Sequence, residues 1–568
     1  MKKILLRLMF LAMLVALLPV HVAQACSAFI VGKDLTADGS TLFGRTEDYP
    51  YAPDGGRHNQ NYVVVPDKTY KDGDKIEDES NGFTYPHLAN EMKYTAVYDS
   101  DRDNGSNGNF AAHGFNELGV AMTATVSATP NDKVLKEDPL VKDGLPEASL
   151  VDLALPRAKT AREVIETVAK VLDEKGSAEG NIIVAADKNE LWYMEILSGH
   201  QYVAIKFPTN KYAVFANTYY LGHVDLNDKE NVIASKDVEE VAKKADNYKT
   251  DKDGNFMIAK SYGPDKYMER NRSRTYAGIK WMDPQAKVNY DDEAFDLLRE
   301  PTDPNKKYTV HDVIAEQRNR FEHLPEYKAD DLVEVGKKID GNVYKYALGN
   351  ENVIDAHVYQ IKPNLPNAFG GVMWLGLAQS RNTPYVPFYG NVEDTYEAFK
   401  NRSTKYDGKS WYWTVWHIDQ MVMKYPEIFG NSIQEKWKAK EAEWDKEQTE
   451  RDAKYANYTD EQAKAAGPEV TKEALERSEK IFKEIKAVEA EMEEKIKKEK
   501  GKDADLVYTG YNKANLLAEA EKGKSTDKAS DTKKDSSSQT TWIVIGVLVV
   551  LVGGFFGYKQ FNKKKEEE

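Results

Sequence analysis

The sequence contains a single cysteine, Cys26, and its position has the clearest chemical consequence. A thiol attacks a carbonyl as thiolate, so it needs a base and surroundings that lower its pKa. An amino-terminal cysteine carries its own base, because a free α-amine has an ordinary pKa of about 7.7–8.0. That amine takes the thiol proton and returns it to the leaving amine, so no histidine is required. A cut before Cys26 would therefore create nucleophile and base together.

The residues ahead of Cys26 have the three parts of an export signal. Basic residues open the segment, an apolar run covers 9–20, and the small residues Ala23 and Ala25 stand where a signal peptidase reads the chain. We predict a signal peptide over 1–25. Cleavage after Ala25 makes Cys26 the first residue of the mature protein.

The opposite end of the chain predicts a membrane anchor. Residues 541–558 are almost entirely apolar and uncharged and are about long enough to cross a bilayer. The lysines of the tail, 559–568, face the cytoplasm by the positive-inside rule. A polar stretch at 521–540 with few apolar residues is typical of a flexible stalk. We therefore expect a single-pass protein of the cell membrane with an extracellular catalytic domain.

Composition narrows the classes of partner. Charged residues make up 30% and hydrophobic residues 41% of the chain, as in soluble globular proteins. Loss of the three basic residues of the leader takes the formal net charge from −15 to −18, which disfavours nucleic acid as a partner. With one cysteine no intrachain disulfide is possible, so an exported protein of this kind depends on its core.

A predicted hairpin places two charged residues beside Cys26. A strand-like run at 27–31 is followed by turn residues at 33–39 and a second extended run from Thr41. Folding about Thr36 puts Cys26 opposite roughly Thr46, with Arg45 and Asp48 on either side. Arg45 would stabilise the thiolate, and Asp48 would hold the α-ammonium group.

The rest of the sequence predicts a layered α+β fold with more strands than helices. We expect a second hairpin at 110–115 and 120–125, a helix at about 150–174, and strands at 182–186, 191–196, 202–205, 212–216, 357–361 and 372–377. Asn217, just past one of these strands, is a neutral donor suited to an oxyanion hole. An asparagine that only forms a turn is an equally good interpretation.

A charged helical extension is predicted over 430–520. Apolar residues at helical spacing trace one stripe along it, and Gly501 is a plausible stop: Leu475, Phe482, Ile485, Val488, Met492 and Ile496. We favour packing of this stripe on the enzyme body over a coiled coil with a partner.

Several blocks in order resemble the dipeptidase-A family of N-terminal-nucleophile cysteine hydrolases, which is related to secernins and, more distantly, to bile-salt hydrolases and penicillin V acylases. The blocks spread over most of 26–429: Cys26-Ser27-Ala28, Phe43-Gly44-Arg45-Thr46-Glu47-Asp48, Asn116-Glu117-Leu118-Gly119-Val120-Ala121-Met122, Glu190-Leu191-Trp192-Tyr193-Met194-Glu195, Phe215-Ala216-Asn217-Thr218 and Tyr385-Val386-Pro387-Phe388-Tyr389. The resemblance implies a four-layer αββα sandwich over 26–429 and hydrolysis of dipeptides or short peptides through a thioester. The extension and the membrane anchor are departures from the family's basic form.

The resemblance also implies roles for particular residues. Cys26 is nucleophile and base, and Arg45 and Asp48 support it. Asn217 matches the asparagine whose amide serves the oxyanion hole, which a backbone N–H near 125–126 completes. A further family arginine corresponds to Arg274, with Arg272 as the alternative. No cofactor is implied.

Other interpretations compete with a peptidase. A lipoprotein with lipidated Cys26 fits poorly, because the usual leucine before the cysteine is absent and a second anchor would be redundant. A non-peptide amidase of the N-acyl amino acid or bile-salt type stays open, as does a non-catalytic surface binding protein. We expect no metal site, since the ten histidines are scattered and no His-Glu-x-x-His run occurs. An acidic run from Asp99 lacks the closing glutamate of a calcium loop.

Overall fold

The computed structural model describes residues 26–49, 57–100, 107–324, 338–339, 342–343 and 347–510. The predicted signal peptide, stalk, transmembrane segment and cytoplasmic tail (1–25, 521–540, 541–558 and 559–568) lie outside these residues, as do 511–520 of the predicted extension. Every helix in the described part of the chain falls short of the length or apolar character that spanning a bilayer requires. The boundaries assigned to the segments stay predictions.

Two antiparallel sheets form the centre of the fold. The smaller has six strands in the order β14 (Tyr212–Phe215), β1 (Ser27–Val31), β2 (Thr41–Asp48), β18 (Val353–Ile361), β19 (Val372–Leu377) and β20 (Val386–Tyr389). The larger has eight in the order β15 (Val232–Ala234), β13 (Tyr202–Lys206), β12 (Leu191–Ile196), β11 (Gly180–Ala186), β10 (Ala121–Ala128), β9 (Asn107–Phe115), β8 (Tyr94–Ser100) and β3 (Gln60–Val65). Strand pairs also form between β4 (Lys68–Thr69) and β7 (Asn90–Glu91), β5 (Lys75–Asp78) and β6 (Phe83–Pro86), and β16 (Lys338–Ile339) and β17 (Asn342–Val343).

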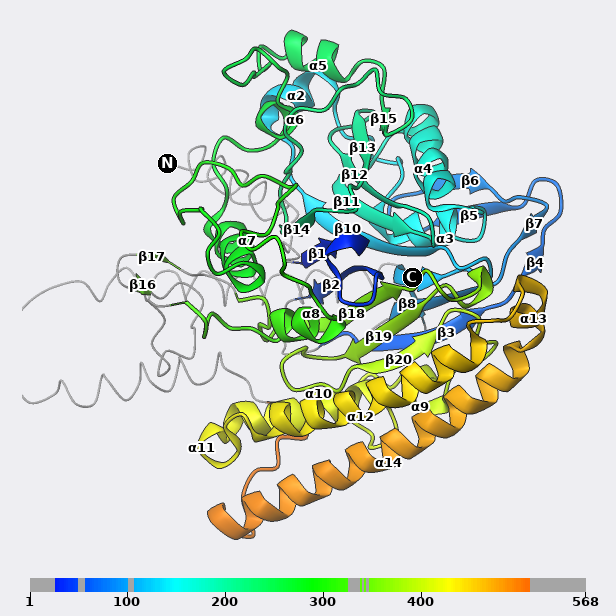
Figure 1. The fold of residues 1–568 in the computed structure, drawn as a ribbon, viewed down its shortest axis with the longest axis vertical. Helices are drawn as coiled ribbons and strands as arrows, with labels where there is room; N and C mark the ends of the chain where they lie inside the picture. The colour runs from blue at the N-terminus through cyan, green and yellow to red at the C-terminus, as the bar shows by residue number, and fades with distance from the viewer. Residues whose placement is uncertain are drawn as a thin grey trace, which may run out of the picture. The chain divides into compact units, whose positions relative to one another are not determined.

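Helices cover both sheets, so the predicted mixture of helices and sheets is confirmed (Figure 1). The larger sheet contacts α3 (Leu150–Ala154) and α4 (Ala161–Lys175). The smaller sheet contacts α7 (Glu269–Met282), α8 (Val310–Gln317), α10 (Trp411–Lys424) and α12 (Ser432–Tyr455). The other helices are α2 (Asp132–Glu137), α5 (Val238–Lys244), α6 (Ile258–Tyr262), α9 (Glu397–Lys400), α11 (Pro426–Phe429), α13 (Asp460–Ala465) and α14 (Gly467–Lys500). Apolar residues of both sheets and of most of these helices share one large core, whereas those of α3 and α4 pack with the larger sheet in a second core.

The first hairpin forms as predicted, with its register shifted by one residue. Ala28 pairs with Arg45 and Ser27 with Thr46, so Cys26 continues the ladder opposite Glu47. Because side chains alternate between the faces of a strand, the shift puts Arg45 and Glu47 on the face of Cys26. Asp48 belongs to the other face of the sheet.

The single helix predicted over about 150–174 is wrong in one respect, because two helices occupy the segment. Pro156 follows α3 and has no N–H to continue a helical ladder. A new helix, α4, then begins after Thr160, whose side chain accepts a hydrogen bond from the Glu163 N–H at 3.1 Å. The predicted apolar positions of α4, including Val164 and Val168, are buried.

The charged C-terminal helices pack on the body of the protein. In α14 the stripe residues Ile485, Val488, Met492 and Ile496 are buried, while Leu475 and Phe482 are half-buried, and the helix ends at Gly501, which has a φ of +100°. Figure 1 shows α12 and α14, yellow and orange, running alongside each other below β19 and β20. The prediction of a helix packed on the body is confirmed for these residues.

A buried ion pair fastens α12 to the end of α8. The Arg318 guanidinium donates to both carboxylate oxygens of Glu441, at 2.9 and 2.5 Å, and also to the Thr383 carbonyl at 2.6 Å. Both side chains are buried. Nearby carbonyls also compensate the Arg318 charge, and the Tyr385 N–H donates to Glu441 at 2.8 Å.

Replacing Glu441 by glutamine tests this attachment. Glu441→Gln leaves a buried guanidinium without its counter-charge, so we expect the free energy of unfolding to fall by about 3–5 kcal/mol. Urea titration followed by tryptophan fluorescence measures the change.

The matched control is Glu443→Gln on the same helix. Glu443 forms an exposed pair with Lys440 at 3.1 Å, with 61% of its side chain exposed. We expect a change within about 0.5 kcal/mol for this variant. Equal effects of the two substitutions would show that the buried pair does not attach α12.

Candidate active site

Cys26 directly precedes β1 and is fully buried. Its Sγ atom is 3.4 Å from Nη1 of Arg45, and its carbonyl oxygen accepts a hydrogen bond from Arg274. Burial raises the pKa of the Cys26 thiol and Glu47 raises it further, whereas Arg45 lowers it. The thiol is therefore neutral in this environment and needs a base before it can attack a carbonyl.

Arg45 reaches Cys26 from the space between the two sheets. Nε donates to Oγ1 of Thr123 at 3.0 Å, and Nη2 donates to the carbonyls of Ala112 at 3.2 Å and Ala124 at 2.7 Å. Nη1 contacts Glu47 and the thiol. All five N–H groups of this guanidinium thus have a partner. The arginine is fixed in place by the larger sheet before any substrate arrives.

Arg274 approaches the same cysteine from α7. Nη1 donates to the Cys26 carbonyl and, at 3.1 Å, to Oγ of Ser27, while Nη2 donates to Oδ1 of Asn217 at 2.8 Å. Asn271, one helical turn earlier, supplies a further acceptor at 2.9 Å. The alternative, Arg272, instead donates to the carbonyls of Tyr290 and Asp292. Of these two arginines, Arg274 is the one in contact with Cys26.

Asn217 presents one unused donor. The register of β14 with β1 pairs Phe215 with Ala28, and continuing it by two residues puts Asn217 opposite Cys26. A guanidinium only donates, so the side-chain atom facing Arg274 must be the amide oxygen. The Asn217 carbonyl also accepts from Asn271 at 2.6 Å, which fixes the backbone. Nδ2 of Asn217 is buried and has no hydrogen-bond partner among the described residues.

Asp48 has an unused acceptor near the same point. Oδ2 accepts a hydrogen bond from Asn350 at 2.6 Å, whereas Oδ1 has no partner within the described ranges. Burial raises the pKa of this carboxyl to about 7, against the lowering effects of Arg274 and Asn350. A cation placed beside Oδ1 would keep the carboxylate ionised.

The backbone beside Arg45 is irregular where a second oxyanion donor was expected. The register of β10 with β11 shifts between Ala124 and Val126, so Thr125 is left out of the ladder. A bulge of this kind frees an N–H group and bends the strand, and bulges are common next to active sites. Arg45 bonds the carbonyl just before the bulge.

Sequence reasoning missed a buried cluster behind Arg45. Nε2 of His113 and Nδ1 of His357 lie 3.1 and 3.0 Å from the same oxygen of Asp355, and all three residues are fully buried. The histidines that are scattered in sequence are therefore not all scattered in space. The available signal was the alternation of Asp355, just before the strand predicted at 357–361, with His357 and Tyr359 on it, because such spacing puts three polar groups on one face.

This cluster is also where the described residues bring three metal-binding side chains within 4.8 Å of one another. The two imidazole rings are stacked, with centroids 3.6 Å apart and planes inclined by 21°. Ring nitrogens bind a metal in the plane of the ring, and stacked planes do not share such a point. The arrangement fits a hydrogen-bonded cluster better than a metal centre.

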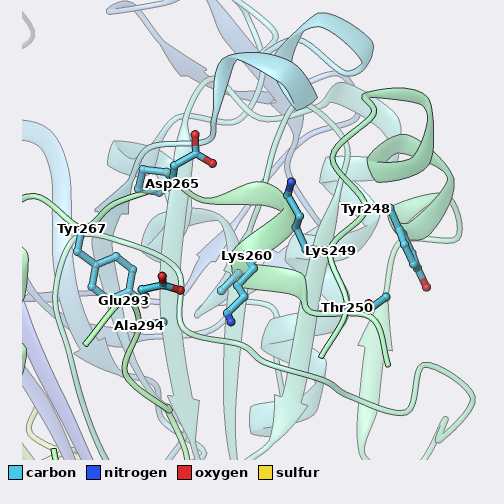
Figure 2. Close-up of a pocket in the computed structure, with 10 residues that line it drawn as sticks. Tyr248, Lys249, Thr250, Lys260, Asp265, Tyr267, Glu293 and Ala294 are labelled. Carbon is cyan, nitrogen blue, oxygen red and sulfur yellow. The ribbon is translucent and has the colours of Figure 1, made fainter. Parts of the chain in front are cut away.

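A hollow of about 430 Å³ opens beside α6, separate from Cys26. Figure 2 shows side chains of both charges around it, among them Lys249, Lys260, Asp265 and Glu293. None of the five predicted site residues lines it. One of its walls, Tyr267, donates to the carbonyl of Tyr219 at 3.1 Å, in the loop that follows Asn217.

Comparison with known proteins gives a consistent result. A profile described as Peptidase family C69 matches residues 25–478. A protein of Streptococcus pyogenes serotype M1 named probable dipeptidase B is 48% identical over 486 residues, which are 84% of this chain and 95% of that protein. A probable dipeptidase of Latilactobacillus sakei is 33% identical over 69% of this chain and 79% of its own length. A probable dipeptidase A of Streptococcus pyogenes serotype M3 is 28% identical over 69% and 81%.

A buried glutamate positions the loop after Asn217 and gives a pH-dependent prediction. Oε1 of Glu195 accepts from the N–H groups of Tyr220 at 2.6 Å and Leu221 at 3.1 Å. Burial raises its pKa from 4.5 to about 7, although these N–H groups and the Tyr193 hydroxyl lower it. The folded protein therefore holds this proton more tightly than the unfolded chain does. Between pH 4.5 and about 7 its contribution lowers the free energy of unfolding as pH rises.

Glu195→Gln removes this titration while keeping an acceptor for the loop. We expect the wild type to lose about 3 kcal/mol relative to the variant between pH 4.5 and pH 7, measured by urea unfolding at several pH values. The exposed Glu240→Gln on α5 should leave the pH dependence unchanged. Parallel curves for wild type and Glu195→Gln would contradict the prediction.

Proposed function

Because this chain belongs to peptidase family C69, we propose that it is a cysteine peptidase that hydrolyses dipeptides or short peptides with Cys26 as its nucleophile. The observation that carries the proposal is the guanidinium of Arg274, which bonds the Cys26 carbonyl and the Asn217 amide oxygen together. Among the described residues, Nδ2 of Asn217 is left without a hydrogen-bond partner, and the strand register places Asn217 opposite Cys26. The names of the relatives favour dipeptides as substrates.

The chemistry begins after the peptide bond before Cys26 is cut. The new α-amine removes the thiol proton, and Arg45 stabilises the resulting thiolate. The thiolate attacks the substrate carbonyl, and the oxyanion that forms accepts hydrogen bonds from Nδ2 of Asn217 and from a backbone N–H at 125–126. The α-ammonium of Cys26 then gives its proton to the amine of the substrate, which leaves. Water then hydrolyses the thioester and regenerates the thiol.

Asp48 has a role in the same scheme through its unused oxygen. A carboxylate at this position holds the α-ammonium that forms when the amine has taken the thiol proton. The ionic partner also keeps the Asp48 carboxyl charged despite its burial. Arg45 and Arg274 hold the nucleophile from the two faces of β1.

The proposal also includes the type of fold and the cellular location of the protein. Two sheets with helices on both outer faces support an αββα sandwich of the N-terminal-nucleophile type over 26–429. The export signal at 1–25 and the apolar segment at 541–558 are the basis for a catalytic domain outside a single-pass anchor. Export and activation would then be one event, since signal cleavage creates the catalytic amine.

Removal of the thiol is the first test. We expect Cys26→Ser to lower kcat/KM for dipeptide hydrolysis by at least about 10³-fold, because the hydroxyl is a far weaker nucleophile than a thiolate. A precursor that keeps 1–25 should be inactive, because its amide nitrogen is no base. Product analysis on dipeptides, N-acyl amino acids and conjugated bile salts distinguishes a peptidase from another amidase. Full activity of the uncleaved precursor would rule out the mechanism.

Intact-mass analysis of the purified protein serves as the control for processing. We expect a mature chain that begins at an unmodified Cys26. Added lipid mass on this residue would instead identify a lipoprotein with a blocked amine.

Asn217→Ala tests the oxyanion donor. We expect kcat to fall by about 10²–10³-fold with little change in KM, since the hydrogen bond strengthens as charge develops in the transition state. Asn131→Ala is the matched control: its amide caps α2 and bonds the carbonyls of Ser261 and Gly263, so only stability should fall, by about 1 kcal/mol. Unchanged kcat in Asn217→Ala would exclude the assigned role.

A further inference from the structure

Four residues face one another across the space between the sheets. In the smaller sheet His357 of β18 pairs directly with Arg45 of β2. In the larger sheet His113 of β9 pairs directly with Thr123 of β10. Asp355 lies two residues from His357, so its side chain is on the same face of β18. The register of both sheets thus brings these groups together behind Cys26.

A continuous chain of hydrogen bonds runs from Arg45 through Thr123 and His357 to Asp355. Nε of Arg45 donates to Oγ1 of Thr123 at 3.0 Å, and Oγ1 lies 2.9 Å from Nε2 of His357. Nδ1 of His357 is 3.0 Å from Oδ2 of Asp355. On the far side, Nε2 of His113 lies 3.1 Å from the same carboxylate oxygen, at ion-pair distance but without hydrogen-bond geometry.

The donors and acceptors allow one consistent arrangement of protons. The guanidinium only donates, so the Thr123 oxygen accepts from it; with a neutral His357 whose proton faces Asp355, the Thr123 hydroxyl gives its own proton to Nε2 of His357. Nδ1 of His357 then carries the proton that faces the Asp355 carboxylate. For His113 the nitrogen nearest Asp355 likewise carries the proton, and Nδ1 accepts from the Tyr359 hydroxyl at 2.7 Å. Both histidines are neutral in this arrangement.

The charged groups around the cluster support neutral histidines. Burial lowers the pKa of His357 to about 3, with His113 and Arg45 contributing in the same direction and Asp355 opposing them. Burial also lowers the pKa of His113, against Asp355. For Asp355 burial acts to raise the pKa, yet the two histidines hold it below its ordinary value. Glu47, on the far side of Arg45, interacts with Asp355 as a like charge.

We propose that Thr123, His357 and Asp355 are positioning residues that hold the Arg45 guanidinium against the Cys26 thiol, and that His113 orients Asp355 from the opposite sheet. The inference rests on the proposed role of Cys26 as nucleophile. None of the four residues contacts the thiol itself in the hydrogen bonds described. Their effect reaches it through Nε of Arg45, which fixes the plane of the guanidinium and therefore the direction of Nη1.

Substitution of Thr123 tests the link at one atom. Thr123→Val keeps the shape of the side chain and removes the hydroxyl, whereas Thr123→Ser keeps the hydroxyl. The test compares kcat and KM of the processed variants. It also follows the thiolate titration by ultraviolet difference absorbance against Cys26→Ala. Because the chain has one cysteine, that difference reports Cys26 alone. The readout needs no substrate, so it stays informative if the protein is not a peptidase.

For Thr123→Val we expect kcat to fall by about 10–100-fold with KM nearly unchanged, and the thiolate titration to move upward by about one pH unit. Thr123→Ser should restore both. Asp355→Asn should resemble Thr123→Val, because an amide at this position favours the other tautomer of His357. If Thr123→Val does not fold, His357→Gln in the same titration provides the test.

The control is Thr414→Val in α10. In the described part of the chain its buried hydroxyl bonds only the Ser410 carbonyl, at 2.7 Å, so this variant should lose stability without a change in titration or kcat. An unchanged titration in Thr123→Val and His357→Gln would overturn the inference while leaving Cys26 as nucleophile. Stoichiometric metal in the purified protein that is lost in His357→Gln would also overturn it, in favour of a metal centre. Full activity of Cys26→Ala would refute the proposed function instead.

Discussion

The structure around Cys26 depends on one buried cation. Arg45 is fully buried and each of its five N–H groups has a partner, so its position is determined by several groups at once. Three of the partners belong to the larger sheet, although Arg45 itself is in the smaller one. Burying a charge costs several kcal/mol unless it is fully hydrogen-bonded, so the two sheets must meet in one relative position.

The second arginine imposes the same constraint from the other face of β1. Arg274 bonds the backbone of Cys26 and the amide of Asn217, which come from different strands, and it does so from a helix. Arg45 therefore contacts the side chain of Cys26 from one face of β1, and Arg274 contacts its backbone from the other. The buried polar atoms left without a partner among the described residues include one donor on Asn217 and one acceptor on Asp48. Unused buried polar atoms are costly, and they are reasonable where a substrate or an α-amine completes the site.

The C-terminal helices pack on the body of the protein. Arg318 and Glu441 connect α8 with α12, and α8 packs on β18, the strand that carries Asp355 and His357. The family profile extends to residue 478, into α14, so the match does not stop at the boundary predicted at 429. Packing of these helices supports the edge of the sheet on which the cluster behind Arg45 is built.

The sequence by itself determined the first hairpin and most strands and singled out Cys26 as the proposed nucleophile, because these depend on local pattern: one cysteine at a predicted cleavage site, a turn between two extended runs, and alternation of apolar residues. It also indicated Arg45, Asp48 and Asn217, with Arg274 and Arg272 left open. Only the tertiary structure separated those two arginines, since residues two apart point to nearly opposite faces of a helix and the sequence does not say which face meets Cys26. Packing of the sheets also decided the one-residue shift in the register of β1 with β2. It likewise brought His113 together with Asp355 and His357, which lie more than 200 residues later in the chain. Local sequence carries no information about such contacts, because they arise from how two faces are aligned and not from what lies beside each residue in the chain.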